Sequence, residues 1–95
     1  MRKDERQCPE LTDQELVRRG ITGDEAALGI LVRRHHAAAY RVALSIMRGD
    51  DVAQDVVQDT FLKAFRPLDR FRGDASFRTW LLTITANEAR GALRR

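Results

Sequence analysis

Residues 51–65 read DVAQDVVQDTFLKAF, and the periodicity of this stretch decides the fold. At about 100° per residue, the small and apolar side chains fall on one side of a helix. They are Ala53, Val56, Val57, Thr60, Phe61 and Ala64. The other side carries polar residues, namely Asp51, Asp55, Gln58, Asp59 and Arg66, but it also carries Leu62 and Phe65. The stretch therefore predicts a helix with a core face and a second apolar patch, made by Leu62 and Phe65 among acids.

Two interpretations of this patch are open from the pattern alone. In the first, Leu62 and Phe65 pack under the loop that follows the helix, and the aspartates only solvate it. In the second, an apolar patch rimmed by acid docks onto another protein that presents a basic helical surface. Asp51 does not separate the two, because an acid in the first turn also complements the helix dipole.

Upstream of this stretch, two further helices are predicted. Thr12 or Asp13 can cap a short one that ends at Gly20, with Glu15 completing a capping box. A long central helix is predicted over residues 24–47. Its apolar face comprises Leu28, Leu31, Val32, His35, Ala39, Val42 and Ile46, widened by Tyr40, Leu44 and Met47.

Downstream, a cap on Asp50 or Asp51 and the proline at position 67 bound the 51–65 helix, which reaches about Arg66. Residues 67–75 are predicted to form a loop, and Ser76 can cap a last helix that continues to the end of the sequence. Strand signals are nearly absent. We therefore predict an all-α fold, a bundle of three main helices plus a short N-terminal one.

The composition is typical of one folded domain with a modest core: 95 residues, 43% hydrophobic and 33% charged. No apolar run approaches the ~20 residues that cross a bilayer, and the charged N-terminus MRKDERQCPE does not form a signal peptide. The single Cys8 cannot form an internal disulfide, so we expect a cytoplasmic protein without membrane insertion. We expect residues 1–10 to be a flexible tail and residues 11–95 to form the domain.

Charge is divided unevenly along the chain. Residues 1–60 contain nine Lys/Arg and eleven Asp/Glu, a net of −2, whereas residues 61–95 contain eight and three, a net of +5. A basic C-terminal third favours a polyanion such as nucleic acid as the partner, although a solvated surface is the simpler alternative.

The predicted last helix carries a polar stripe without acid. Its members are Thr83, Asn87, Arg90 and Arg94, with Trp80 at the edge and Ser76 at the start. Thr, Asn and Arg side chains contact phosphates and base edges in nucleic-acid complexes. On the opposite side, Leu81, Ile84, Ala89 and Ala92 are predicted to pack inward.

Residues 71–80, FRGDASFRTW, surround the start of this helix with aromatic and basic side chains. Aromatic faces stack on unpaired bases for roughly 1–3 kcal/mol each. Phe71, Phe77 and Trp80 can therefore hold an unstacked base, while Asp74 reads its edge and the arginines hold the strand. The alternative, which applies above all to Phe77 and Trp80, is that these rings close the end of the core.

Enzyme signatures are missing from the sequence. His35 and His36 are adjacent and point about 100° apart on a helix, so they are poorly placed to chelate one metal ion. His35 falls on the apolar face, and we interpret it as a core histidine. There is no glycine-rich phosphate loop, no zinc-ligand spacing and no nucleophile with an evident base. We predict no catalytic residue, no metal and no cofactor.

Two long stretches resemble region 2 of the bacterial sigma-70 family of RNA polymerase sigma factors, most closely its extracytoplasmic-function (ECF) branch. They are GDEAALGILVRRHHAAAYRVALSIM (residues 23–47) and DVAQDVVQDTFLKAFRPLDRFRGDASFRTWLLTITANEARGALRR (residues 51–95). The likeness runs from about Leu11 to Arg95. Its sharpest pieces are GDEAA, DVVQDTFLKAF and FRGDASFRTWL.

This resemblance implies a domain that binds core RNA polymerase and recognises and melts the minus-ten promoter element. The positions matching those that bind the coiled coil of the polymerase β′ clamp are Asp55, Gln58, Asp59, Leu62 and Phe65. The positions matching those that contact the non-template strand, including a loop that captures a flipped base, are Arg70, Phe71, Arg72, Gly73, Asp74, Ala75, Ser76, Phe77, Arg78, Trp80, Thr83, Asn87, Arg90 and Arg94.

The resemblance also has departures and consequences. Thr83 and Ile84 stand where housekeeping relatives carry two aromatic melting residues, which predicts weaker melting and stricter promoter choice. Family members continue through a linker to a helix-turn-helix domain that reads the minus-thirty-five element. That domain is absent from this chain, so we expect the chain to be a truncated piece of a longer factor. An anti-sigma protein is an expected partner, and it would cover the polymerase-binding surface.

Two other functions are kept as alternatives. A sigma mimic that titrates an anti-sigma factor would keep the surface around Leu62 and Phe65 but need no base pocket, and the arginines of the last helix argue against it. A duplex-reading helical DNA-binding domain would bind double-stranded DNA at least as well as single strands.

Overall fold

The computed structural model describes residues 11–94, and every regular element in that range is a helix. The elements are α2 (Asp13–Ile21), α3 (Glu25–Ile46), α4 (Asp50–Phe65), the 3-10 helix η2 (Leu68–Arg70) and α5 (Phe77–Arg94). The all-α prediction of three long helices and a short leading one is confirmed. The predicted tail over residues 1–10, with Cys8, lies outside the described residues.

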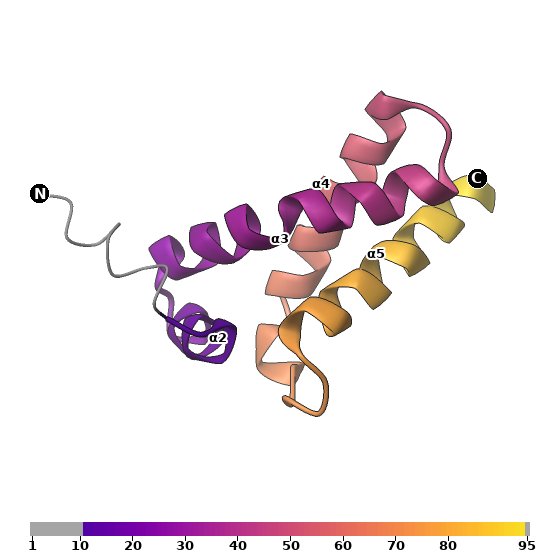
Figure 1. Ribbon diagram of the computed structural model, residues 1–95. Coiled ribbons are helices and arrows are strands. Elements are labelled where there is room, and N and C mark those ends of the chain that lie inside the picture. Colours follow the sequence, from indigo (N-terminus) through magenta and orange to yellow (C-terminus); the bar gives the residue numbers. More distant parts are fainter. Residues whose placement is uncertain (1–10, 95) are drawn as a thin grey trace, which may run out of the picture.

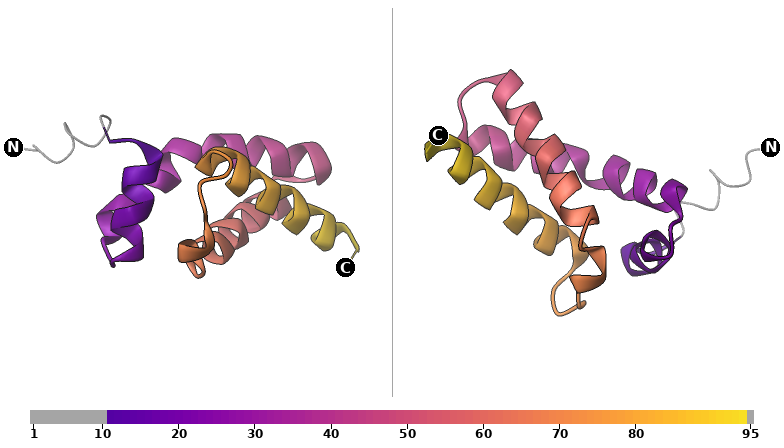
Figure 2. Two further views of the ribbon diagram at one scale, coloured as in Figure 1. Left: turned by 90° about the horizontal axis from the view of Figure 1, so that it is seen from below. Right: turned by 180° about the vertical axis from the view of Figure 1, so that it is seen from behind.

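The long helix α3 is the element on which the others pack. Helices α4 and α5 pack on α3 and against each other, and α2 packs on α3 and contacts η2. Figure 1 shows α3 crossing the molecule, with α2 below its N-terminal part. The two views in Figure 2 place the segment between η2 and α5 at the same end of the molecule as α2. This arrangement brings α2 close to residues 71–73, although the two segments are far apart in the sequence.

The core is built from the inner faces predicted for α4 and α5. All six predicted core residues of α4 are buried. Of the four predicted for α5, Leu81 and Ala89 are buried and Ile84 and Ala92 are partly buried, whereas Thr85 is buried although it was not predicted. Ala39, Ala43 and Ala53 are fully buried, and such small side chains let helices pack closely. The predicted face of α3 was slightly misplaced. Leu44 is 41% exposed, whereas Ile30 and Ala38 are buried.

Helix α2 begins as predicted but ends later. Thr12 Oγ1 accepts from the Glu15 backbone N–H at 3.1 Å, and Glu15 Oε1 accepts from the Thr12 N–H at 3.0 Å, which confirms the capping box. The prediction that Gly20 stops the helix was wrong. A Cβ at Gly20 would lie 2.5 Å from Leu28 Cδ2, so this glycine permits close packing of α2 on α3 within a continuing helix.

Two other boundaries differ from the predictions. The N-cap of α4 is Gly49, with φ of 116° and no capping side chain, rather than Asp50 or Asp51. The Asp50 carboxylate instead accepts from the Tyr40 hydroxyl of α3 and from Gln54 Nε2. The predicted loop contains η2, whose Leu68 is buried and anchors it to the core.

Candidate functional site

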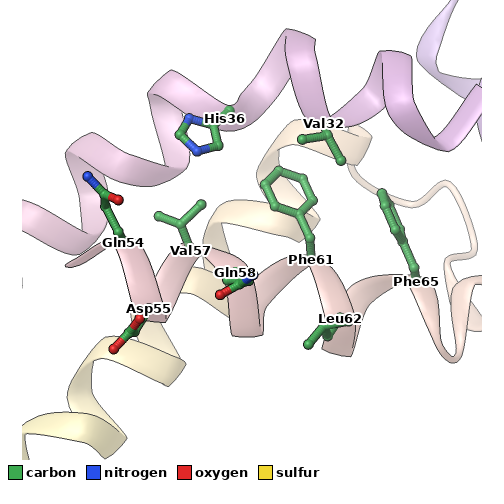
Figure 3. A pocket seen from close by; sticks show the side chains of 9 residues that line it. All are labelled: Val32, His36, Gln54, Asp55, Val57, Gln58, Phe61, Leu62 and Phe65. Carbon is green, nitrogen blue, oxygen red and sulfur yellow. The ribbon is translucent and has the colours of Figure 1, made fainter. Parts of the chain in front are cut away.

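The outer side of α4 forms one wall of a groove against α3. The groove has a volume of about 450 Å³. Four of the five predicted polymerase-binding residues line it, namely Asp55, Gln58, Leu62 and Phe65, whereas Asp59 does not. In Figure 3, Phe61 and Phe65 rise from α4 toward α3, and Leu62 lies on the outer side of α4. The structure therefore brings most of this predicted set together around one concave surface.

Burial separates the two interpretations of the Leu62 and Phe65 patch. Leu62 is 58% exposed, so it does not pack under the following loop. Phe65 is half-buried, its ring centroid lies 5.7 Å from that of Phe61, and it also borders a second cavity beside Leu68. Leu62 is thus a surface residue, and Phe65 divides its ring between the core and the groove.

The opposite wall of the groove contains residues that the sequence did not identify as functional. Val32 and His36 of α3 line it, and Figure 3 shows both side chains directed toward α4. They are four residues apart and therefore share a helix face. That spacing could have identified the pair, but Val32 was assigned to the core, where it is only partly buried.

The polar stripe of α5 lies at the surface, as predicted. Thr83, Asn87, Arg90 and Arg94 are all exposed, and Arg90 Nη1 donates to Asn87 Oδ1 at 3.3 Å. The acid of α5, Glu88, accepts from Lys63 Nζ of α4 at 2.8 Å and so lies on another side of the helix. The stripe is consequently cationic, with a hydroxyl and an amide that precede its two arginines along the helix.

The segment before α5 is open to solvent at its tip and anchored at its base. Residues 72–76 are exposed, and Gly73 adopts φ of 83°, a left-handed conformation that favours glycine. Ser76 caps α5 as predicted, since its Oγ accepts from the Thr79 backbone N–H at 3.0 Å. Arg70, Arg72, Asp74, Ala75 and Arg78 are exposed around this turn.

The aromatic residues of this segment form a cluster with unequal access to solvent. Phe77 is 1% exposed, and its ring centroid lies 5.4 Å from that of His35, 5.8 Å from that of Phe71 and 5.9 Å from that of Trp80. Its ring faces are closed to a base, so Phe77 belongs to the core, as the alternative interpretation held. Phe71 and Trp80 are half-buried and retain exposed surface.

A pocket of about 280 Å³ lies beside Gly73, between this segment and α2. One wall is made by Phe71, Arg72 and Gly73. The other is made by Gln14, Val17, Arg18 and Ile21 of α2, to which the sequence assigned no function. Nothing within the α2 sequence signals this role, because the pocket exists only where two distant segments meet.

The position of α2 is fixed by a polar cluster with α3. Asp13 Oδ1 accepts from Arg34 Nη1 at 3.0 Å, and Asp13 Oδ2 lies 2.7 Å from His35 Nε2. His35 is 6% exposed, so it is a core histidine as interpreted, although its Nδ1 has no hydrogen-bond partner.

The described residues contain no group of three or more metal-ligating side chains. Across residues 11–94, none of the helices has both the length and the apolar character that crossing a bilayer requires.

Comparison with known proteins gives consistent matches. A family model described as Sigma-70 region 2 matches residues 31–95. ECF RNA polymerase sigma-E factors of Salmonella typhimurium and Escherichia coli K12 are each 47% identical over 85 residues, which is 88% of this chain and 44% of the relative. The chain therefore spans less than half the length of these curated relatives.

Two solved structures are also similar. An NMR structure of an engineered region 2 of sigmaE in complex with GTAAAA is 39% identical, with a TM-score of 0.82, over 90% of this chain and 88% of that one. CnrH in complex with the cytosolic domain of CnrY is 39% identical, with a TM-score of 0.76, over 83% of this chain and 51% of CnrH.

Proposed function

The chain belongs to the sigma-70 region 2 family, in its ECF branch, and from this premise we propose that it acts in transcription initiation. In this proposal it binds core RNA polymerase and recognises and melts the minus-ten promoter element. Family members are non-enzymatic regulators, in agreement with the prediction that the chain is not an enzyme. The observation that carries the proposal is the presence of two exposed surfaces of different chemistry on separate helices, α4 and α5.

The groove between α3 and α4 is the proposed polymerase site. Its centre is apolar, with Leu62 outermost, and Asp55 and Asp59 place negative charge beside it. An amphipathic helix that carries basic residues is the partner that fits such a groove, because its apolar face covers Leu62 and its cations meet the acids. The coiled coil of the β′ clamp is the proposed partner.

The Gly73 turn and the α5 stripe are the proposed promoter site. Arginines on α5 would hold the phosphates of the non-template strand, and the pocket beside Gly73 would take one extruded base. Extrusion costs a few kcal/mol of stacking and pairing. Stacking on exposed aromatic surface returns roughly 1–3 kcal/mol per base, and phosphate contacts and the polymerase supply the rest.

The residues at positions 83 and 84 support a melting mechanism without an aromatic wedge. Thr83 Oγ1 donates to the Thr79 carbonyl at 2.9 Å, and Ile84 is partly buried against the core. Neither residue presents a ring to the duplex. Opening would therefore depend on capture of the extruded base, which makes promoter choice sensitive to the identity of that base.

A regulatory protein partner is also part of the proposal. CnrH was solved in complex with the cytosolic domain of CnrY. By analogy, an anti-sigma protein would bind the present chain and cover the α3–α4 groove, in competition with the polymerase. These roles would place the protein in the cytoplasm, where the polymerase and the promoters are.

The proposed promoter function is tested by measuring the affinity of the chain for short DNA strands. The set contains a minus-ten non-template strand, the matching duplex, and strands in which each position is varied in turn. We expect tighter binding to the single strand than to the duplex, with one position at which substitution weakens binding most. Equal or tighter binding to the duplex would favour the duplex-reading alternative instead.

A further inference from the structure

We propose that α2 forms half of the base-binding site, with Gln14 contacting the edge of the captured base and Arg18 contacting a neighbouring phosphate. The inference deepens the proposed promoter function and rests on it, because the ligand is an unpaired base of the promoter strand. It assigns a binding role to a helix that otherwise packs on α3 and η2.

The size and lining of the pocket suit a single base. At about 280 Å³ it lies just below the roughly 300–1,000 Å³ of ordinary small-molecule sites, so it admits one planar ring system better than a larger ligand. Val17, Ile21 and Phe71 give it apolar walls, and Ile21 is 46% exposed although its side chain is apolar. Apolar walls around a flat ring replace the stacking that the base loses on extrusion.

Gln14 has the chemistry to distinguish bases. Its carboxamide offers donors and an acceptor side by side, which matches the paired groups on a base edge, most often those of adenine. A Cβ built on Gly73 would lie 3.7 Å from Gln14 Nε2, so the amide directly faces the turn. Among the described residues, no hydrogen bond engages the Gln14 side chain. The amide is therefore available to a ligand.

Two cations flank the same opening from different elements. Arg18 comes from α2 and Arg72 from the turn, and both are exposed pocket residues. A base entering between them would bring its own phosphate within reach of their guanidinium groups. None of the neighbouring acids lines the pocket. Asp13 is engaged by Arg34 and His35, Glu15 accepts from the Thr12 backbone, and Asp74 is exposed.

The two walls are held in place by contacts within the protein. Asp13 joins α2 to Arg34 and His35 of α3, and the His35 ring packs on Phe77, which in turn contacts Phe71 in the other wall. At the far end of α2, the close approach of Gly20 to Leu28 and Leu68 fixes the helix against α3 and η2. A pre-formed site binds its ligand at a lower entropic cost.

The test uses the full chain and the GTAAAA strand with its single-position variants, measured at several salt concentrations. Gln14→Ala is expected to lower the discrimination at one position about tenfold and to leave the salt dependence unchanged. Gln14→Glu keeps the side-chain size but replaces the amide donor with a charged acceptor, so it should lose the same base preference and also weaken binding to every strand. Arg18→Ala is expected to weaken binding to every strand and to reduce the salt slope by about 0.7. Arg19→Ala is the matched control, since Arg19 is an exposed cation of α2 outside the pocket.

The outcomes separate this inference from the function on which it rests. Unchanged discrimination in both Gln14 variants would overturn the role of Gln14, and equal salt slopes for the Arg18 and Arg19 variants would overturn that of Arg18. Either result leaves the promoter function standing, provided that the unmodified chain prefers single strands. If the unmodified chain shows no such preference, the promoter function and this inference fail together.

Discussion

Helices α4 and α5 bury similar inner faces but present different chemistry to solvent. Each packs on α3 and on the other through small and apolar residues such as Ala53, Ala64, Leu81 and Ala89. Outside, α4 exposes Asp55, Asp59 and Leu62, whereas the exposed stripe of α5 is basic and free of acid. Substitutions at such exposed positions usually change stability by less than about 0.5 kcal/mol. The identity of the outer residues is therefore set by what each surface binds rather than by the stability of the fold.

The largest predicted effect is a loss of stability when the buried ring of Phe77 is removed, in contrast to the exposed residues. Phe77→Ala is expected to lower the free energy of unfolding by about 3–5 kcal/mol, because it empties space between His35, Phe71 and Trp80. Urea denaturation followed by circular dichroism measures this loss. Phe77→Leu, which keeps most of the apolar volume, should lose clearly less. A stability close to that of the unmodified chain would show that Phe77 is not the core residue described here.

The next effect concerns the α4 surface alone. Leu62→Ala is expected to weaken binding to the β′ clamp coiled coil by about 10–100-fold, because the most exposed apolar side chain of the groove is removed. The stability change should stay below about 0.5 kcal/mol. The affinity is measured as binding of each variant to a surface-immobilised clamp fragment. Leu93→Ala is the control, since Leu93 is exposed to a similar extent on α5. Equal affinities for the two variants would remove Leu62 from the polymerase site.

A smaller effect is expected for the α5 surface. Arg90→Ala should weaken binding to single-stranded promoter DNA several-fold and flatten its salt dependence by about 0.7 in slope, since one phosphate contact is lost. Titrations at several salt concentrations give the slope. Lys63→Ala removes the same charge from the α4 side, where Lys63 pairs with Glu88, and should change the slope less. An unaltered slope in Arg90→Ala would exclude that residue from the DNA contacts.

The smallest predicted effect is a change in the pKa of Tyr40, at the contact between α3 and the start of α4. The hydrogen bond to Asp50, with lesser contributions from desolvation and the Asp50 charge, raises the pKa of Tyr40 above its ordinary value of 10.0. The bond exists while the phenol is protonated, so its contribution is present below pH 10 and is lost as the pH rises through the raised pKa. Tyr40 is the single tyrosine, so an absorbance titration reports it alone. Asp50→Asn should lower the pKa, and an unchanged titration would show that Asp50 does not act on Tyr40.

The difference between α4 and α5 also shows what the sequence can predict. The inner face of α4 followed in full from helical periodicity and that of α5 in part, since the buried Thr85 was not predicted. The exposed stripes followed from what that periodicity left outside. Errors occurred where tertiary packing decided the outcome. Gly20 lies inside α2 in close contact with Leu28 and Leu68, and Gly49 is the N-cap of α4 while Asp50 accepts a hydrogen bond from Tyr40.

The groove and the pocket were predicted to different degrees, because residues on one helix can be grouped from the sequence whereas residues brought together by packing cannot. Seven of the nine groove residues lie on α4. Helical periodicity placed Asp55, Gln58, Leu62 and Phe65 away from its core face, and the family resemblance grouped them as a binding site. The opposite walls, Val32 and His36 for the groove and Gln14 and Arg18 for the pocket, come from other helices. The four-residue spacing of Val32 and His36 puts them on one face of α3, but no local pattern shows that this face meets α4 or that α2 meets the Gly73 turn.

The central claim is that two separate surfaces of one helical bundle bind two different partners. The most direct test measures Leu62→Ala and Arg90→Ala each in both assays, clamp binding and single-strand binding, after circular dichroism confirms that both fold. We predict that Leu62→Ala loses clamp affinity and keeps its affinity for DNA, and that Arg90→Ala does the reverse. Loss of both activities in either variant would contradict the account, because it would mean that the two surfaces do not act separately.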